Sequence, residues 1–175
     1  MRRLLVTGGA GFIGANFVYY WMRQHPEDHI VVLDALTYAG NEASLDDLKG
    51  KPNFKFVAGS IADQPLVEKL LVEEILDTIV NFAAESHVDR SISGPDIFLE
   101  TNVIGTHNIL KAARKVWIEN EATANPDHRF HHVSTDEVFG ALGGDEAAFT
   151  EKSRYRPRNP YSASKAASDH LVRSY

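Results

Sequence analysis

The chain has 175 residues, a formal net charge of -6 and no cysteine. This length suits one α/β domain with a buried core and is too short for two large domains. The negative charge argues against a nucleic-acid partner, which needs a basic stripe, and the lack of cysteine excludes disulfides and thiolate metal sites. The sequence has no apolar run of spanning length and no signal-peptide pattern, so we expect a soluble cytoplasmic protein.

A glycine-rich turn follows the first predicted strand. The apolar run over residues 4–6 predicts a buried parallel strand, and a helix is predicted over 12–23. Between them, Gly8 permits a tight turn, Gly11 lets a pyrophosphate approach the backbone, and Gly14 lets the helix pack closely on the strand. The free N–H groups of the first helical turn favour phosphate. The pattern therefore predicts a dinucleotide-binding turn.

An aspartate ends the second predicted strand, which covers residues 30–33. Asp34 follows the glycines by about twenty residues, the spacing of a carboxylate that accepts hydrogen bonds from the adenosine ribose hydroxyls. Because that carboxylate would repel a 2′-phosphate, we predict NAD rather than NADP. The alternative interpretation is a solvated aspartate at a strand end.

Strands and helices continue to alternate along the rest of the chain. Asp63 and Pro65 favour the start of one helix, as an N-cap and a first-turn residue. Residues 120–127 form a polar connection, and the alternation predicts one doubly wound parallel sheet of the Rossmann type over residues 1–175. The remaining predicted elements are strands over 54–58, 77–82 and 129–134, a short helix over 44–48, and helices over 64–73 and 95–117.

Two adjacent carboxylates, Asp136 and Glu137, follow the fifth predicted strand. If both approach one substrate, repulsion and burial should raise the pKa of at least one, which gives an acid and a base at neutral pH. The alternative is that Asp136 caps a turn and Glu137 is solvated. We do not expect His131 and His132 to bind a metal, because neighbouring strand residues point to opposite faces.

A tyrosine and a lysine one helical turn apart begin the last predicted helix. Asn159 is a good N-cap and Pro160 a good first helical residue, so Tyr161 and Lys165 should share one face. An ammonium near a phenol stabilises the phenolate, so we expect the pKa of Tyr161 to be lowered toward that of a working base. Lys165 could also hold the ribose of a nicotinamide cofactor.

Five motifs, in this order, resemble those of the extended short-chain dehydrogenases/reductases and specifically those of the dTDP-glucose 4,6-dehydratases. They are TGGAGFIG at 7–14, LTYAGN at 36–41, AAESHVDRSI at 83–92, STDEVFG at 134–140 and YSASKAASD at 161–169. The first and last identify only the superfamily. ESHVDRS together with Thr-Asp-Glu is more specific, because the related nucleotide-sugar epimerases and decarboxylases lack that acid pair.

The resemblance implies dehydration of dTDP-glucose to a 4-keto-6-deoxy sugar nucleotide through an internal NAD redox cycle. Tyr161, beside Lys165, would take the C4 hydroxyl proton while hydride moves to NAD, and Thr135 would polarise that oxygen. Glu137 would then remove the C5 proton and Asp136 would protonate the departing C6 hydroxyl, before hydride returns to C6.

The resemblance also implies which residues border the ligands. Ser86 and Thr135 would touch the sugar, and a homodimer through the two long helices is expected by analogy. The residues expected to border NAD are Gly8, Gly11, Phe12, Ile13, Gly14, Asp34, Ala35, Leu36, Thr37, Ser60, Ile61, Phe82, Ala83, Ala84, Ser86, Thr101, Tyr161 and Lys165.

Three features depart from the family pattern. Ser60 stands where an aspartate is usual, which weakens the expected adenine contact, and Phe139 replaces a usual tyrosine near the acid pair. Tyr175 falls inside a predicted helix without a stop signal, whereas family proteins continue into a C-terminal region that holds the nucleotide. We therefore expect a fragment that lacks that substrate region. An NAD-binding module without turnover and a related epimerase or decarboxylase are the alternative functions.

Overall fold

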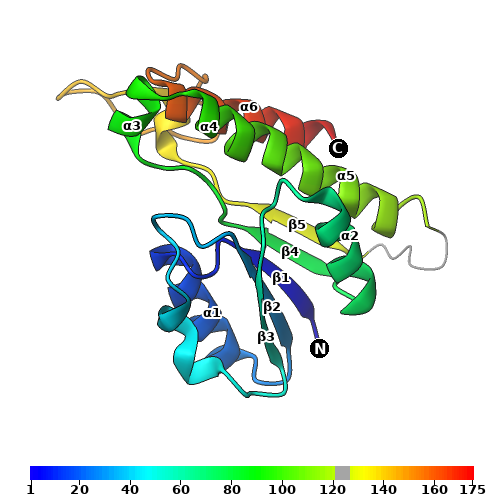
Figure 1. Ribbon diagram of the computed structural model, residues 1–175. Coiled ribbons are helices and arrows are strands. Elements are labelled where there is room, and N and C mark those ends of the chain that lie inside the picture. Colours follow the sequence, from blue (N-terminus) through cyan, green and yellow to red (C-terminus); the bar gives the residue numbers. More distant parts are fainter. Residues whose placement is uncertain (121–126) are drawn as a thin grey trace.

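In the part of the chain that the structure describes, five parallel strands form one sheet with helices on both faces, as the computed structural model shows (Figure 1). The structure describes residues 1–120 and 127–175, so the predicted polar connection lies almost entirely outside the described residues. The strands are β1 (Arg3–Thr7), β2 (His29–Asp34), β3 (Phe54–Ala58), β4 (Thr78–Asn81) and β5 (Arg129–His132), in the order β3-β2-β1-β4-β5. Every neighbouring pair is parallel, which confirms the doubly wound sheet.

Most of the helices lie where the sequence predicts them. Helix α2 begins as predicted, with Asp63 accepting a hydrogen bond from Leu66 N, and Asn159 caps α6 through Ser162 N. The helices are α1 (Phe12–Gln24), α2 (Gln64–Glu73), α3 (Val88–Ser93), α4 (Asp96–Phe98), α5 (Thr106–Trp117) and α6 (Pro160–Ser174), with short helices η1 (Glu42–Leu48), η2 (Leu99–Gly105) and η3 (Asp136–Phe139).

Two parts of the helical prediction differ from the structure. The single helix predicted over 95–117 consists of α4, η2 and α5, because η2 widens into π-helical turns. Helix α3 was not predicted, because a β-branched and serine-rich segment has low helix propensity. Tertiary packing holds this helix instead, since Ser91 is fully buried and α3 packs against α6.

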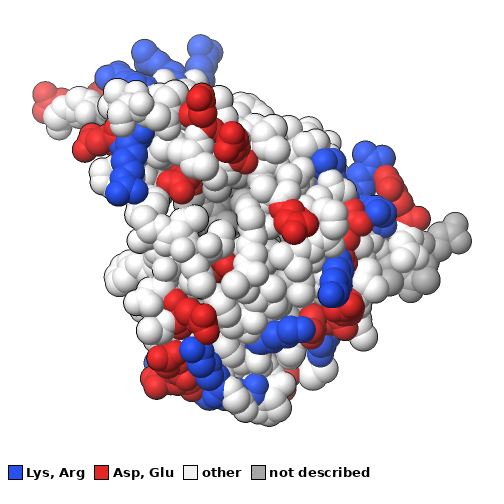
Figure 2. Space-filling model, viewed as in Figure 1, with Lys and Arg blue, Asp and Glu red and all other residues white. Residues whose placement is uncertain are grey.

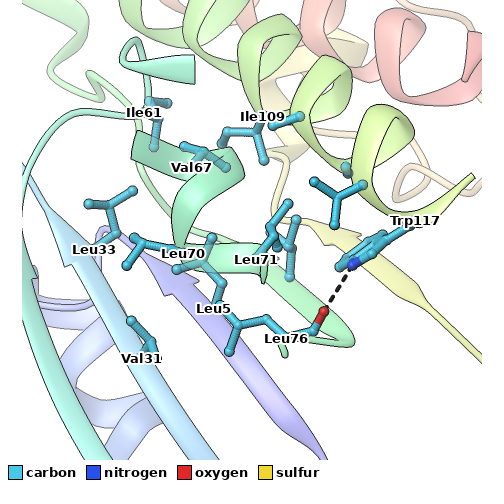
Figure 3. Close-up of a cluster of buried hydrophobic side chains, with 14 residues drawn as sticks. Leu5, Val31, Leu33, Ile61, Val67, Leu70, Leu71, Leu76, Ile109 and Trp117 are labelled. Carbon is cyan, nitrogen blue, oxygen red and sulfur yellow. Dashed lines mark hydrogen bonds between the residues drawn. The ribbon is translucent and has the colours of Figure 1, made fainter. Parts of the chain in front are cut away.

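Alternation along the central strands gives each face of the sheet its own core. Leu4 and Val6 of β1 pack toward α1, whereas Leu5 belongs to a larger cluster with α2 and α5. Figure 3 shows this larger cluster, in which Trp117 donates its indole N–H to Leu76 O at 2.9 Å. The sheet is therefore packed between two apolar layers.

All five strands run in the same direction, so the loops that follow them lie along one edge of the sheet. In Figure 1 these loops lie toward the side where α3 and the start of α6 are found. In open parallel sheets this edge is where ligands bind. Within residues 1–120 and 127–175, no helix combines the length and apolar character needed to cross a membrane.

The α2 core contact can be tested with two adjacent positions. Leu71 is 2% exposed and Val72 is 52% exposed. We expect Leu71→Ala to lower the free energy of unfolding by about 2–5 kcal/mol, because it leaves a cavity. The matched control Val72→Ala should change it by less than about 0.5 kcal/mol. Urea denaturation followed by circular dichroism measures both, and equal losses would contradict this core assignment.

Candidate active site

The turn after β1 packs directly against the segment after β4. Gly8 has a φ of +68°, and a Cβ there would lie 2.6 Å from Ala83 N, so this position requires glycine. A Cβ at Gly14 would collide with the carbonyl oxygen of Gly8. Gly14 therefore packs α1 on the turn itself and not on the strand, which corrects the expected contact. At Gly11 the nearest atoms to a Cβ would be Gly8 O at 3.3 Å and Ala39 O at 3.8 Å.

The N-terminus of α1 is open toward this turn. Among the described residues no side chain caps α1, and its first turn carries no acidic residue. The N–H groups of residues 12–14 are therefore available, and the helix dipole favours an anion beside them. Phe12 and Ile13, the first two residues of α1, are exposed. These features fit a pyrophosphate.

Asp34 joins the end of β2 to the glycine turn. Its carboxylate is buried, and it accepts hydrogen bonds from Ala10 N at 2.9 Å and Leu36 N at 2.8 Å. The interpretation as a solvated aspartate is therefore wrong. A carboxylate has about four lone-pair sites, so acceptor capacity remains for ribose hydroxyls. Leu36 adopts a left-handed φ of 51°, a strained conformation that often marks a functional segment.

The residues expected near adenine differ in how their side chains lie. Ser60 is exposed, and its hydroxyl accepts from Ala62 N at 3.1 Å. Ile61 is buried in the core, and its side chain packs against Gly105 of η2. Ile61 can therefore face a ligand only through its backbone. Ala35 and Thr37 are exposed on the loop after β2.

The loop after β4 is held by an asparagine that the sequence analysis did not single out. Asn102 of η2 is buried, accepts from Glu85 N at 2.8 Å and donates to Glu85 O at 2.9 Å. It also donates to Ser164 Oγ at 2.9 Å, and that hydroxyl donates to Tyr161 O at 2.7 Å. Asn102 thus connects the segment that leads to Ser86 with the helical turn that carries Tyr161.

A helical pattern could have revealed Asn102. It lies on the same side of the helical path as the buried residues Phe98, Thr106 and Ile109, and a buried amide needs specific partners. Of the other residues predicted here, Phe82, Ala83 and Ala84 follow β4 near the Gly8 turn, Ser86 is exposed, and Thr101 lies partly buried on η2.

The acid pair lies at the start of η3, directly after β5. Thr135 caps η3, because its hydroxyl accepts from Glu137 N at 3.3 Å, so Asp136 is not the cap. Glu137 is partly buried and accepts from Asn159 Nδ2 at 3.2 Å, so it is more than a solvated side chain. Asp136 is exposed. The two carboxylates therefore have different surroundings, which is how neighbouring acids acquire different roles.

Tyr161 and Lys165 lie one turn apart on α6, as predicted, but the lysine ammonium has a partner on the sheet. Lys165 is 3% exposed, and its Nζ donates to Val133 O at 2.7 Å. Burial lowers the pKa of Lys165 to about 8, while the nearby Asp169 carboxylate opposes that shift. The lysine therefore joins α6 to the chain segment that leads from β5 to the acid pair.

The expected lowering of the Tyr161 pKa is wrong for this chain by itself. Burial raises the pKa of the phenol, and the nearby carboxylates, Glu137 and Asp136 foremost, raise it further. A hydrogen bond with the Thr135 hydroxyl acts in the opposite direction. The physical reason is that a half-buried phenolate would lose hydration and face negative charge.

The structure therefore brings a phenol, a hydroxyl and two carboxylic acids together at one strand end. Figure 2 shows the molecular surface hollowed between the α1 side and the α3–α6 side, with most of the charged side chains lying toward the margins of this view. A phenol can exchange a proton with a sugar hydroxyl, and two acids in different surroundings can remove and deliver protons. Among the described residues, no group of three or more histidine or acidic side chains could hold a metal ion.

Comparison with known proteins places the chain in a family. A family model described as GDP-mannose 4,6 dehydratase matches residues 5–175. The dTDP-glucose 4,6-dehydratase of Xanthomonas campestris pv. campestris strain B100 is 54% identical over 175 residues, which cover 100% of this chain and 49% of the relative. The dTDP-glucose 4,6-dehydratase 1 of Escherichia coli K12 is 44% identical over 181 residues, which cover 99% of this chain and 50% of the relative.

Solved structures agree with this likeness. DesIV, a dTDP-glucose 4,6-dehydratase from Streptomyces venezuelae solved with NAD bound, has a TM-score of 0.87 and 47% identity, covering 99% of this chain and 51% of that chain. The UDP-Glc/GlcNAc 4-epimerase of Campylobacter jejuni has a TM-score of 0.85 at 28% identity, and the match covers 99% of this chain and 49% of that chain. The chain spans about half the length of the curated relatives it matches. It belongs to the GDP-mannose 4,6-dehydratase family of NAD-dependent epimerases and dehydratases, and it resembles the N-terminal portion of dTDP-glucose 4,6-dehydratases.

Proposed function

We propose that this chain is the NAD-binding portion of a dTDP-glucose 4,6-dehydratase and that it carries the catalytic residues. The observation that supports the proposal most strongly is the position of Asp136 and Glu137 beside Tyr161, at the edge that also carries the glycine turn. The likeness to dTDP-glucose 4,6-dehydratases over the whole chain supports the same substrate. The shared fold alone would equally suit an epimerase, so the acid pair is the feature that favours a dehydratase.

The residues present fit NAD. The open first turn of α1 would hold the pyrophosphate, and the remaining acceptor sites of Asp34 would bind the adenosine ribose. Lys165 would support the nicotinamide ribose. When bound, NAD supplies a hydride acceptor that serves as a hydride donor later in the cycle.

The chain's own groups would then move the protons. Tyr161 would accept the proton of the sugar C4 hydroxyl, with Thr135 donating a hydrogen bond toward the same oxygen. The C4 ketone makes the C5–H bond acidic, so Glu137 would remove that proton as Asp136 protonates the C6 hydroxyl. The C6–O bond breaks, and water leaves.

The cofactor proposal is tested at Gly11. A Cβ at this position meets Gly8 O at 3.3 Å, so Gly11→Ala should fold, but the methyl group would occupy the space that the pyrophosphate needs. We expect NAD affinity to fall by about tenfold or more, since overpacking costs about 1–3 kcal/mol. The control is Gly144→Ala, because a Cβ at Gly144 has no atom within 4 Å. Isothermal titration calorimetry measures the NAD affinity of both variants. Unchanged affinity in Gly11→Ala would refute the proposed pyrophosphate site at the glycine turn.

The reaction is tested by incubating the protein with dTDP-glucose and NAD and detecting a 4-keto-6-deoxy product. We expect Glu137→Gln to reduce product formation by about 10²–10⁴-fold while NAD binding is retained, because the base is lost. Glu73→Gln, an exposed change on α2, is the control. Undiminished turnover in Glu137→Gln removes that residue from the mechanism. NAD binding without any turnover by the unmodified protein would support the alternative, an NAD-binding module.

We also infer a homodimer through the helical face formed by α4, η2 and α6. Ile97, Leu99 and Ile104 are about half exposed on α4 and η2, although large apolar side chains favour burial. Sedimentation velocity should show a dimer at high concentration, and Ile104→Glu should shift it toward monomer. Val72→Glu, on α2, should not. A monomer at every concentration would contradict this inference.

A further inference from the structure

We propose that Asp169 is a positioning residue of the site, which fastens α6 to the end of β5 and places a fixed negative charge one helical turn from Lys165. This inference rests on the proposed function, because it concerns how the residues assigned there are held. Asp169 lies within the last of the five sequence motifs, eight positions after Tyr161.

One carboxylate oxygen of Asp169 holds two other segments. Asp169 is buried on α6, and its Oδ2 accepts from Ser134 Oγ at 2.6 Å and from Tyr155 OH at 2.9 Å. Ser134 immediately precedes Thr135, so this bond joins α6 to the strand end that carries the acid pair. The Tyr155 ring packs edge-on against Phe139 of η3, with centroids 5.3 Å apart. Asp169 therefore lies where α6, the β5 end and the segment before α6 meet.

The other oxygen of Asp169 faces a neutral histidine. His132 Nε2 lies 3.5 Å from Asp169 Oδ1, which is buried and has no hydrogen-bond partner within the described part of the chain. His132 Nδ1 lies 3.1 Å from Asn81 Nδ2, and Asn81 Oδ1 is occupied by the Thr7 hydroxyl. The asparagine therefore donates, and His132 carries its proton on Nε2, toward Asp169 and the Ser168 hydroxyl.

This arrangement leaves the Asp169 charge to act on Lys165. Burial, together with the Lys165 charge, lowers the pKa of His132 to about 4, so no imidazolium balances Asp169 at neutral pH. Asp169 opposes the burial that lowers the pKa of Lys165. Without that carboxylate, burial acts unopposed and more of the lysine is neutral. A neutral amine would bind a ribose hydroxyl less strongly and would not stabilise a phenolate.

The other ionisable groups around the pair have separate effects. His132 on β5 is neutral, and Tyr155 bonds directly to Asp169. Asp136 and Glu137 on η3 act on Tyr161. Asp169 is thus the charge whose removal should change the ionisation of Lys165, whereas the hydrogen bonds to Asp169 govern how firmly the segments are joined.

The role of the Asp169 charge is tested with Asp169→Asn. This change keeps the shape of the side chain and an oxygen that can accept hydrogen bonds from Ser134 and Tyr155. The control is Tyr155→Phe, which keeps the charge and removes one hydrogen bond. In protein labelled with ¹³C at lysine Cε, the Lys165 signal is assigned by its absence in Lys165→Met and titrated by NMR. We expect a midpoint near pH 8 in the unmodified protein, a lower midpoint in Asp169→Asn and no shift in Tyr155→Phe. An unchanged midpoint in Asp169→Asn, or equal shifts in both variants, would overturn the proposal.

The hydrogen bonds that join α6 to the end of β5 are tested with a double variant, Ser134→Ala with Tyr155→Phe, which keeps the Asp169 charge. This variant also tests the proposal if Asp169→Asn fails to fold. Amide hydrogen exchange should quicken over residues 133–139 and stay unchanged in β1 and β2, while the Lys165 midpoint stays near pH 8. Unchanged exchange over 133–139, or a lowered Lys165 midpoint, would refute the proposed role. Neither measurement uses dTDP-glucose or turnover, so either failure leaves the dehydratase proposal intact.

Discussion

The contact between the Gly8 turn and Ala83 is the constraint on which the site depends. Since a Cβ at Gly8 would lie 2.6 Å from Ala83 N, the ends of β1 and β4 can approach this closely only with glycine. The approach places the segment after β4 beside the open N-terminus of α1. From there Asn102 connects that segment to α6, and Asn159 connects α6 to Glu137. The glycine turn and the group formed by Tyr161, Asp136 and Glu137 thereby share one edge of the sheet.

Burial sets the ionisation of this edge as strongly as charge does. It raises the pKa of Tyr161 and lowers that of Lys165, so both groups are moved toward their neutral forms. Asp169 acts differently on the two, because its negative charge favours the lysine cation and disfavours the phenolate. The chain alone therefore does not produce an activated tyrosine. A positive charge near the phenol, such as a bound oxidised nicotinamide ring, would be needed to lower the pKa of Tyr161.

The sequence predicts the sheet well because β1, β2 and β4 each contain a short apolar run bounded by polar residues. It predicts α2 to the residue because Asp63 and Pro65 mark its start. The sequence pattern fails to predict an element where tertiary contacts determine the secondary structure, as in α3. The same limit explains why Asn102 and Asp169 were missed, since Asn102 pairs with Ser164, 62 residues away, and Asp169 pairs with Ser134, 35 residues away. The pKa of Tyr161 was misjudged because burial and the direction of the Lys165 side chain are not readable from spacing.

The central claim is that one dinucleotide can lie on the glycine turn and reach Tyr161 and the acid pair. A crystal structure of the protein with NAD tests this most directly. We expect the pyrophosphate at the N–H groups of residues 12–14, the adenosine ribose on Asp34 and the nicotinamide ring facing Tyr161. A dinucleotide bound elsewhere, or one whose nicotinamide lies away from Tyr161 and Glu137, would contradict the account.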